Sequence, residues 1–233
     1  MGIVKHIPNT ITSMNLLCGV MGVIFTIEGR PDIAFTLMIA AAVFDFCDGL
    51  AARLLGAYSN IGKELDSLAD MVSFGVLPSV MLLQAMGPQP YRYICLFLAA
   101  MSALRLAKFN VDERQESDFL GVATPTSAMI CGSLCYLIYS GSAPWLQDLA
   151  VSHWFLPVVA MVLGLLLVSE IPMFGMKIKK GHKLLDAKRI VFLSLVVAAI
   201  VVTIVLGLNW SFAVLAIFVA YILENLVLAV TAH

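Results

Sequence analysis

The chain carries the stretch Asp45-Phe46-Cys47-Asp48-Gly49-Leu50-Ala51-Ala52-Arg53 and, eight residues later, Gly62-Lys63-Glu64-Leu65-Asp66-Ser67-Leu68-Ala69-Asp70. The segments around both stretches are strongly apolar, so these four aspartates are expected inside a membrane. An acidic side chain near the middle of a transmembrane helix costs roughly 2.5 to 3.5 kcal/mol on insertion scales. Four of them together need a compensating partner, and divalent cations would supply it.

The composition is that of a membrane protein. Of the 233 residues, 61% are hydrophobic and only 12% are charged, with a mean hydropathy of +0.97. Soluble domains carry about 25% charged residues, and nothing in this composition supports nucleic-acid binding. We therefore expect one integral membrane domain over 1–233, an all-α polytopic helix bundle. Since a span needs about 20 apolar residues, eight spans are predicted, near 10–28, 33–53, 64–87, 91–108, 124–142, 153–170, 188–207 and 210–230.

Lysine and arginine are distributed unequally between the two sides that alternate along these spans. Twelve fall on one side, whereas only Arg30 and Arg92 fall on the other. Because cytoplasmic loops carry the excess of basic residues, both termini are expected in the cytoplasm, which requires an even number of spans, eight or six. The acidic stretches then lie toward the cytoplasmic ends of the second and third spans, in the inner membrane.

Helical periodicity gathers the aspartates on two faces. Each face combines two aspartates with small residues: Asp45, Asp48, Gly49 and Ala52 on the first, and Gly62, Asp66, Asp70 and Ser73 on the second. Carboxylates without Cys or His select hard cations such as Mg²⁺ or Mn²⁺, and four can hold two ions about 3.5 to 4 Å apart. Two-metal sites suit phosphoryl chemistry. The glycines would let a phosphate or sugar approach the backbone, and the Arg53 guanidinium would donate hydrogen bonds to a phosphate oxygen.

Other interpretations of the same aspartates stay open. An intramembrane aspartate is often a hydrogen-bond partner between helices, and a pair of them can bind a proton or sodium ion in a transporter. A divalent-cation or proton-coupled transporter is therefore the alternative from a different class of protein. The glycines and the arginine at these spacings favour phosphoryl chemistry instead.

The pattern D-x-x-D-G-x-x-A-R, eight residues, then G-x-x-x-D-x-x-x-D resembles the signature of the CDP-alcohol phosphotransferases, and 45–70 matches it at every defined position. The resemblance implies an integral membrane enzyme, commonly a homodimer, in which an alcohol displaces CMP from a CDP-activated donor. It also implies roles for individual residues. Two cations would be held by Asp45, Asp48, Asp66 and Asp70, with Asp70 also accepting the proton. The nucleotide would be contacted by Asn9, Thr12, Gly49, Ala52, Arg53 and Gly62.

Three flanking segments resemble those of serine-using members of this family: P-N-x-x-T-x-x-N-L-x-x-G at 8–19, R-L-A-x-F-N at 105–110 and S-x-I-P-M at 169–173. This implies CDP-diacylglycerol as the donor and L-serine as the acceptor. Arg105, Lys108 and Asn110 would lie near the acceptor or the lipid phosphate, although the two cations also fit ordinary interface anchors. Ala123 departs from the family, which has a proline there. Another acceptor, glycerol 3-phosphate or inositol phosphate, stays open.

Overall fold

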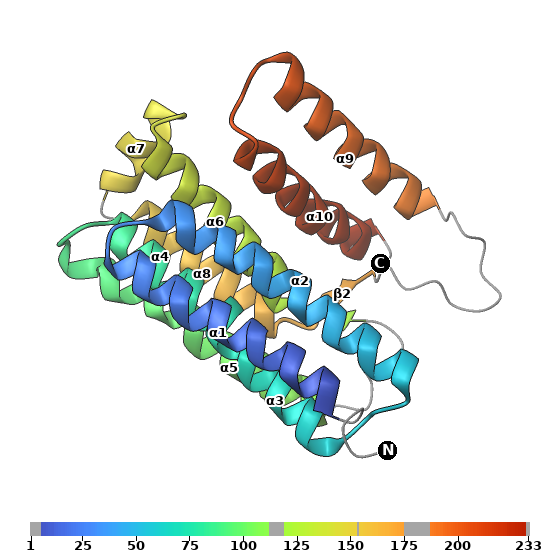
Figure 1. Ribbon diagram of the computed structural model, residues 1–233. Coiled ribbons are helices and arrows are strands. Elements are labelled where there is room, and N and C mark those ends of the chain that lie inside the picture. Colours follow the sequence, from blue (N-terminus) through green and yellow to red (C-terminus); the bar gives the residue numbers. More distant parts are fainter. Residues whose placement is uncertain (1–5, 112–118, 153, 175–186, 232–233) are drawn as a thin grey trace.

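The computed structural model describes residues 6–111, 119–152, 154–174 and 187–231 (Figure 1). Helices make up nearly all of these residues: α1 (Ile7–Ile27), α2 (Pro31–Leu55), α3 (Asn60–Asp70), α4 (Leu77–Ala85), α5 (Phe97–Val111), α6 (Thr124–Ser140), α7 (Pro144–Val151), α8 (Phe155–Val168), α9 (Ala187–Val205) and α10 (Ser211–Thr231). The remaining elements are a π-helix, η2 (Met71–Val76), a 3-10 helix, η3 (Pro90–Leu96), and two antiparallel two-residue strands, β1 (Phe119–Leu120) and β2 (Pro172–Met173). The predicted helical bundle is confirmed, with this small strand pair added.

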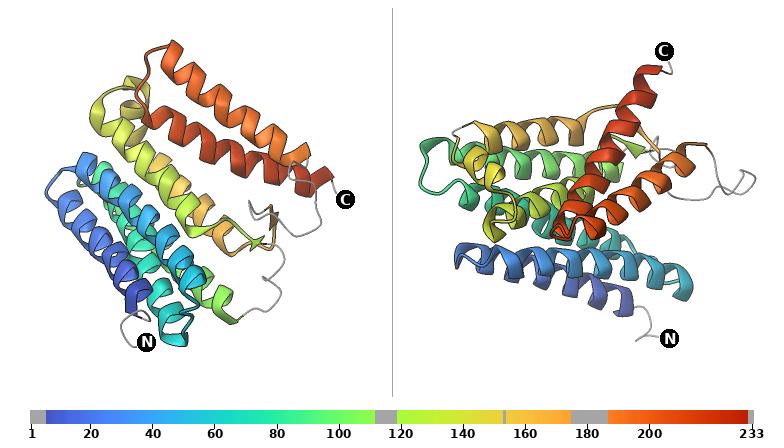
Figure 2. Two further views of the ribbon diagram at one scale, coloured as in Figure 1. Left: turned by 45° about the vertical axis from the view of Figure 1, so that its right-hand side comes forward. Right: turned by 90° about the horizontal axis from the view of Figure 1, so that it is seen from above.

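Helices α1 to α6 and α8 run side by side along one direction, and α9 and α10 form a hairpin against one flank of the bundle (Figures 1 and 2). The core between them is built from fully buried side chains of several helices, among them Phe35, Leu77, Leu137 and Leu156. The first turn of α1 and the last turn of α10 lie at the same end of the bundle. An even number of spans would give this arrangement.

Six helical stretches of the described residues are long and apolar enough to cross a membrane: Ile7–Ile27, Pro31–Leu55, Asn60–Ala85, Pro90–Val111, Lys188–Val205 and Ser211–Thr231. The bent pair α7 and α8 would make a seventh. Helix α6 has 17 residues and is therefore about 26 Å long, just short of a hydrocarbon core of about 30 Å. The chain is thus an integral membrane protein, while the count of eight spans and the side on which the termini lie stay predictions. Arg114 and the basic positions 177–186 lie outside the described residues.

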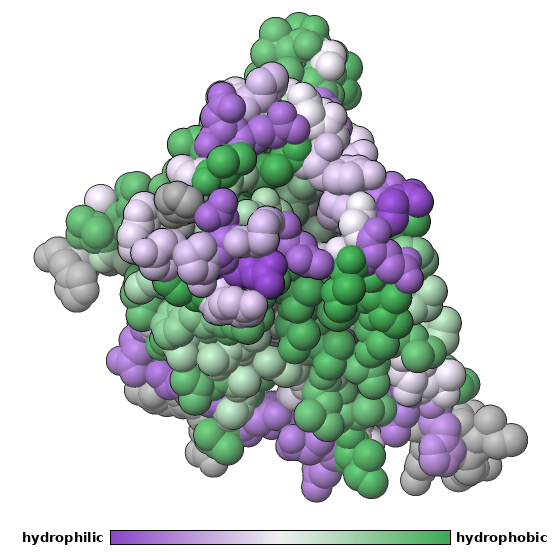
Figure 3. Space-filling model, turned by 90° about the vertical axis from the view of Figure 1, so that its left-hand side faces the viewer, coloured by the Kyte–Doolittle hydropathy of each residue, from purple (hydrophilic) through white to green (hydrophobic). Residues whose placement is uncertain are grey.

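The outer surface matches a lipid environment. Only 6% of the apolar stretch of α9 and 11% of that of α10 are buried. In lipid an apolar side chain needs no cover from the rest of the protein. The space-filling view shows a broad continuous apolar surface beside a polar patch (Figure 3). Lipid contact therefore accounts for the large exposed side chains of these helices.

Helix α1 packs on its neighbours through small and polar residues instead of large apolar ones. Apart from Cys18, the buried positions repeat at intervals of four and three residues: Pro8, Thr12, Asn15, Gly19, Gly22 and Thr26. Small residues at such a seam let helix backbones approach closely in a membrane. At Gly19 the approach is tightest, because Ser73 of η2 lies against it and donates its hydroxyl to the carbonyl oxygen of Asn15 at 3.0 Å.

Replacing Gly19 with alanine should lower the stability of the protein. A Cβ at this position would lie 2.9 Å from the Cα and 3.0 Å from the N of Ser73, so backbone must move. We expect a loss of about 1–3 kcal/mol, the usual cost of overpacking, measured by thermal unfolding in detergent. Gly49→Ala is the matched control for stability, because its Cβ would meet only the Arg53 side chain, at 3.6 Å. An equal loss in both variants would contradict the close packing of α1 on η2.

Candidate active site

The turn between α2 and α3 brings the two acidic stretches together. Helix α2 ends at Leu55, and the next residue, Gly56, adopts the left-handed conformation with φ of 59° that favours glycine at a helix C-terminus. Helix α3 begins after Ser59, whose hydroxyl accepts a hydrogen bond from the backbone N–H of Gly62 at 3.0 Å. The short connection reverses the chain, so the end of α2 and the start of α3 lie close to one another (Figure 1).

Three of the four aspartates form one cluster. Asp45 and Asp48 of α2 and Asp66 of α3 each offer a carboxylate oxygen, and these oxygens lie within 4.8 Å of one another. Asp48 is buried and the other two are half-buried. The Oδ1 atom of Asp66 is buried with no hydrogen-bond partner among the described residues. Like charges this close repel unless a cation or proton intervenes, and an all-oxygen donor set suits Mg²⁺ or Mn²⁺. The cluster therefore fits a divalent cation.

Asp70, the fourth aspartate, lies one turn further along α3 and has a different environment. It is buried, and its Oδ1 accepts a hydrogen bond from Nδ2 of Asn15 at 3.1 Å. The π-helix η2 begins at the next residue, and π-helical turns occur frequently at functional sites. Asn15 was not among the predicted site residues, although its spacing of three from Thr12 on α1 was a signal that both face the same neighbours.

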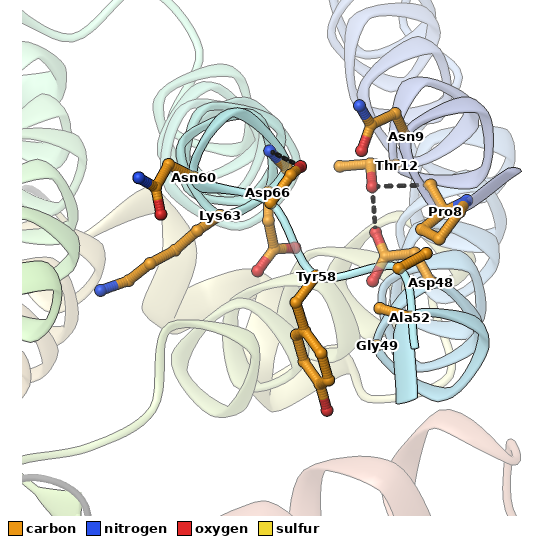
Figure 4. Close-up of a pocket in the computed structure, with 13 residues that line it drawn as sticks. Pro8, Asn9, Thr12, Asp48, Gly49, Ala52, Tyr58, Asn60, Lys63 and Asp66 are labelled. Atoms are coloured by element: carbon orange, nitrogen blue, oxygen red, sulfur yellow. Dashed lines mark hydrogen bonds between the residues drawn. The ribbon is translucent and has the colours of Figure 1, made fainter. Parts of the chain in front are cut away.

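Thr12 has a structural partner at the site. Its hydroxyl donates to Oδ2 of Asp48 at 2.5 Å and also lies 3.0 Å from the carbonyl oxygen of Pro8 (Figure 4). Hydrogen bonds to a carboxylate are short and about twice as strong as those between neutral groups. Thr12 therefore fixes one carboxylate of the cluster, and its predicted contact with a nucleotide stays a prediction.

A cavity of about 450 Å³ opens beside the cluster, within the size range of small-molecule sites. In Figure 4, Asp48 and Asp66 face the same space from two different helices. The lining comes from α1, α2, α3 and the turn between the last two: Pro8, Asn9, Thr12, Asp48, Gly49, Ala52, Ala57, Tyr58, Ser59, Asn60, Gly62, Lys63 and Asp66. Five of the six predicted nucleotide residues line it. At Gly62, a Cβ would lie 3.0 Å from Oδ1 of Asn9, so glycine keeps this wall open.

The basic residues Arg53 and Lys63 differ in their relation to the cavity. Arg53, the sixth predicted nucleotide residue, is exposed outside the lining, and its Nε donates to the carbonyl oxygen of Gly49 at 3.1 Å. Lys63 lines the cavity, and its Nζ donates to the carbonyl oxygen of Asn110 at 3.0 Å. Lys63 was not among the predicted site residues, although it directly follows Gly62, which was.

The three residues predicted for the acceptor side are all on α5 but point to different partners. Arg105 is buried and donates to the Val122 carbonyl at 2.8 Å and to Oγ1 of Thr124 at 3.2 Å. Lys108 is half-exposed and pairs with Glu170 at 3.4 Å. The side-chain amide of Asn110 donates to the Ser67 hydroxyl of α3 at 2.9 Å. None of the three belongs to the cavity lining described above, so their acceptor role stays a prediction.

The fold and the site together define a class: a polytopic membrane protein with a carboxylate-rich, cation-competent pocket near the ends of its second and third helices. Residues 5–168 match the model of the CDP-alcohol phosphatidyltransferase family. The chain belongs to this family. The matched region holds every predicted site residue and ends with α8, so the α9 and α10 hairpin lies outside it.

Similar proteins carry related names. A Mycobacterium leprae protein named CDP-diacylglycerol--serine O-phosphatidyltransferase is 36% identical over 186 residues, which are 76% of this chain and 59% of the relative. A Helicobacter pylori protein of the same name is 30% identical over 194 residues, 81% of this chain and 80% of the relative. An archaetidylserine synthase of Methanothermobacter thermautotrophicus is 32% identical over 133 residues, 54% and 56% of the two chains. The chain spans about three fifths of the length of its mycobacterial relatives.

Proposed function

We propose that this chain transfers a phosphatidyl group from CDP-diacylglycerol to the hydroxyl of L-serine and releases phosphatidylserine and CMP. The observation that carries the proposal is the cluster of Asp45, Asp48 and Asp66 beside a cavity of about 450 Å³. The names of the relatives support serine as the acceptor, and the archaeal relative supports an ether-linked donor as an equivalent lipid. The basic residues support a cytoplasmic site, and the family resemblance supports a homodimer.

Two divalent cations, Mg²⁺ or Mn²⁺, would be held by the four aspartates and would supply charge stabilisation for the pyrophosphate and the departing CMP. Thr12 keeps the Asp48 carboxylate in place, and the small residues Gly49, Ala52 and Gly62 leave room for the cytidine and its phosphates. Lys63 adds a positive charge at the same wall. The acyl chains of the donor stay in lipid while the nucleotide enters the cavity from the aqueous side.

Asp70 would accept the proton of the serine hydroxyl. This hydroxyl is a weak nucleophile at neutral pH, so a positioned base is needed for attack. The hydrogen bond from Asn15 to Oδ1 holds the Asp70 carboxylate, and Oδ2 is then the oxygen that takes the proton. Arg105, on the neighbouring helix α5, would attract the carboxylate of serine or the lipid phosphate.

The test is CMP release by purified protein in detergent, with CDP-diacylglycerol, Mn²⁺ or Mg²⁺, and one acceptor at a time. We expect release with serine and its loss in EDTA. Release only with glycerol 3-phosphate or inositol phosphate would keep the chemistry and replace the acceptor. Metal flux into sealed vesicles without CMP release from any acceptor would instead establish the transporter alternative.

A further inference from the structure

Two side chains of α10 form hydrogen bonds with the backbone N–H and the backbone carbonyl of Phe174, the residue that follows strand β2. The N–H of Phe174 donates to Oδ1 of Asn225 at 2.8 Å, and its carbonyl oxygen accepts from the Tyr221 hydroxyl at 3.0 Å. Asn225 is 1% exposed, and its Nδ2 donates to the carbonyl oxygen of Tyr221 at 2.7 Å. A backbone group without a partner costs several kcal/mol in a membrane, so these two side chains take the place of a neighbouring strand.

The ring of Phe174 is held by the same hairpin. It packs edge-on against Phe192 of α9 and Tyr221 of α10, with ring centroids 6.0 and 5.3 Å apart, and those two rings are 5.6 Å from each other. Aromatic pairs in this arrangement add about 0.5–1.5 kcal/mol beyond area burial. Because α9 and α10 are otherwise largely exposed, Phe174 is a principal attachment point between the hairpin and the segment that contains β2.

From Phe174 a short path of backbone contacts leads to Arg105. Strand β2 pairs with β1, and the N–H of Gly121, just after β1, donates to the carbonyl oxygen of Ile171 at 2.9 Å. The next residue, Val122, accepts the hydrogen bond from Nε of Arg105. Only glycine fits at position 121, because its φ is 74° and a Cβ there would meet the carbonyl oxygen of Leu167 at 2.6 Å.

Arg105 also lies close enough to Asp70 and to Tyr221 of α10 to interact electrostatically with both. Tyr221 is therefore linked to Arg105 both by this electrostatic interaction and by the hydrogen-bonded path through Phe174, β2, β1 and Val122. The cavity beside Asp48 and Gly62 is lined by residues of α1, α2, α3 and the turn between α2 and α3.

We propose that Tyr221 and Asn225 are positioning residues that fix the Phe174 backbone and thereby the Arg105 guanidinium beside Asp70, so that a helix outside the family-matched region sets the affinity for the acceptor alcohol. The proposal rests on the proposed function in one respect, that the Asp70 and Arg105 side receives the acceptor. The proposal predicts different effects on the two substrates, because α10 contributes no residue to the lining of the cavity proposed for the donor.

Two variants test the proposal. Tyr221→Phe keeps the ring contacts and removes the hydroxyl, while Asn225→Leu keeps the approximate size and removes Oδ1. Leu223→Ala is the control, on the same helix with a side chain that is 56% exposed. The first measurement is hydrogen–deuterium exchange of the peptide over 119–124, which needs no substrate. The second compares the KM for serine with the KM for CDP-diacylglycerol.

Faster exchange over 119–124 in Tyr221→Phe and Asn225→Leu, but not in Leu223→Ala, is the expected result. The KM for serine should rise about three- to tenfold, the effect of one hydrogen bond, while the donor KM stays within twofold. Unchanged exchange, or equal rises in both KM values, would overturn the proposal. If wild-type protein uses another alcohol, the serine assignment fails, and the KM for that alcohol replaces the KM for serine. If no alcohol releases CMP, the proposed function fails, and exchange alone decides the positioning role.

Discussion

Replacing Asp66 with asparagine is expected to abolish CMP release and, at the same time, to raise the melting temperature of the protein in EDTA. The Asp66 carboxylate forms a cluster with those of Asp45 and Asp48, and one oxygen from each residue lies within 4.8 Å of the others. Without a cation, removing one of three close charges relieves repulsion in a poorly solvated place. With a cation, the same change removes a ligand whose Oδ1 has no hydrogen-bond partner among the described residues.

The expected loss of turnover is at least about 10²–10³-fold, the range for losing one preorganised electrostatic contact at a reaction centre. The expected gain in EDTA is a few degrees, since about 1 kcal/mol shifts the melting temperature of a domain of this size by roughly 2–4 °C. Wild-type protein should gain stability as Mn²⁺ is added, and Asp66→Asn should gain much less, because binding to the folded state alone stabilises it.

Glu64→Gln is the matched control for Asp66→Asn. It removes a carboxylate from the same helix, two residues earlier, at an exposed position outside the cluster. We expect its turnover, its melting temperature in EDTA and its response to Mn²⁺ to resemble those of wild-type protein. Full stabilisation of Asp66→Asn by Mn²⁺, together with retained turnover, would show that the three aspartates do not form the metal centre.

Helical periodicity predicted an acidic face on each of two successive helices. Asp45 and Asp48 lie three residues apart, and Asp66 and Asp70 lie four residues apart, which places each pair on one face of its helix; three of these four form the close cluster. Side-chain chemistry then selected the class of ligand. This reasoning works because each step is local: it needs the geometry of single helices and no information about more distant parts of the chain.

The residues that the sequence did not identify depend on contacts between distant helices. Asn15 reaches Asp70 where glycines let α1 approach η2, and Nζ of Lys63 reaches the carbonyl oxygen of Asn110 on α5. Arg53 shows the reverse case. Its position one turn after Gly49 also allows a hydrogen bond to its own helix, and this bond is the one formed. Sequence spacing alone cannot decide between a ligand and a neighbouring carbonyl.

The span count was uncertain for a related reason. Hydropathy identifies apolar stretches, but whether a stretch forms one straight helix depends on its ends. The predicted span near 153–170 corresponds to α8, which is sharply bent relative to α7. The predicted span near 124–142 corresponds to α6, which is shortened by the left-handed Gly141 after its last residue. The two acidic helices carry no such break before their aspartates, so the site was easier to predict than the complete topology.

Asp70→Asn is expected to remove turnover while leaving the metal-bound cluster in place. Asp70 lies outside the group of three close carboxylates, and asparagine keeps an oxygen that can accept the hydrogen bond from Asn15. The amide cannot take a proton from the acceptor hydroxyl, so the contribution of a general base, about 10²–10⁴-fold, should be lost. CMP release measures this loss, and the melting temperature as a function of Mn²⁺ concentration measures the cluster.

The comparison with Asp66→Asn separates the two roles, because both variants remove one negative charge from the same helix. Asp66→Asn should lose turnover and most of the stabilisation by Mn²⁺, whereas Asp70→Asn should lose turnover and keep the stabilisation that comes from the first ion. If Asp70→Asn loses the Mn²⁺ response to the same extent, Asp70 is primarily a metal ligand and the base lies elsewhere. If it retains turnover near the wild-type level, Asp70 is neither, and its bond to Asn15 serves only to pack α1 against the start of the π-helix.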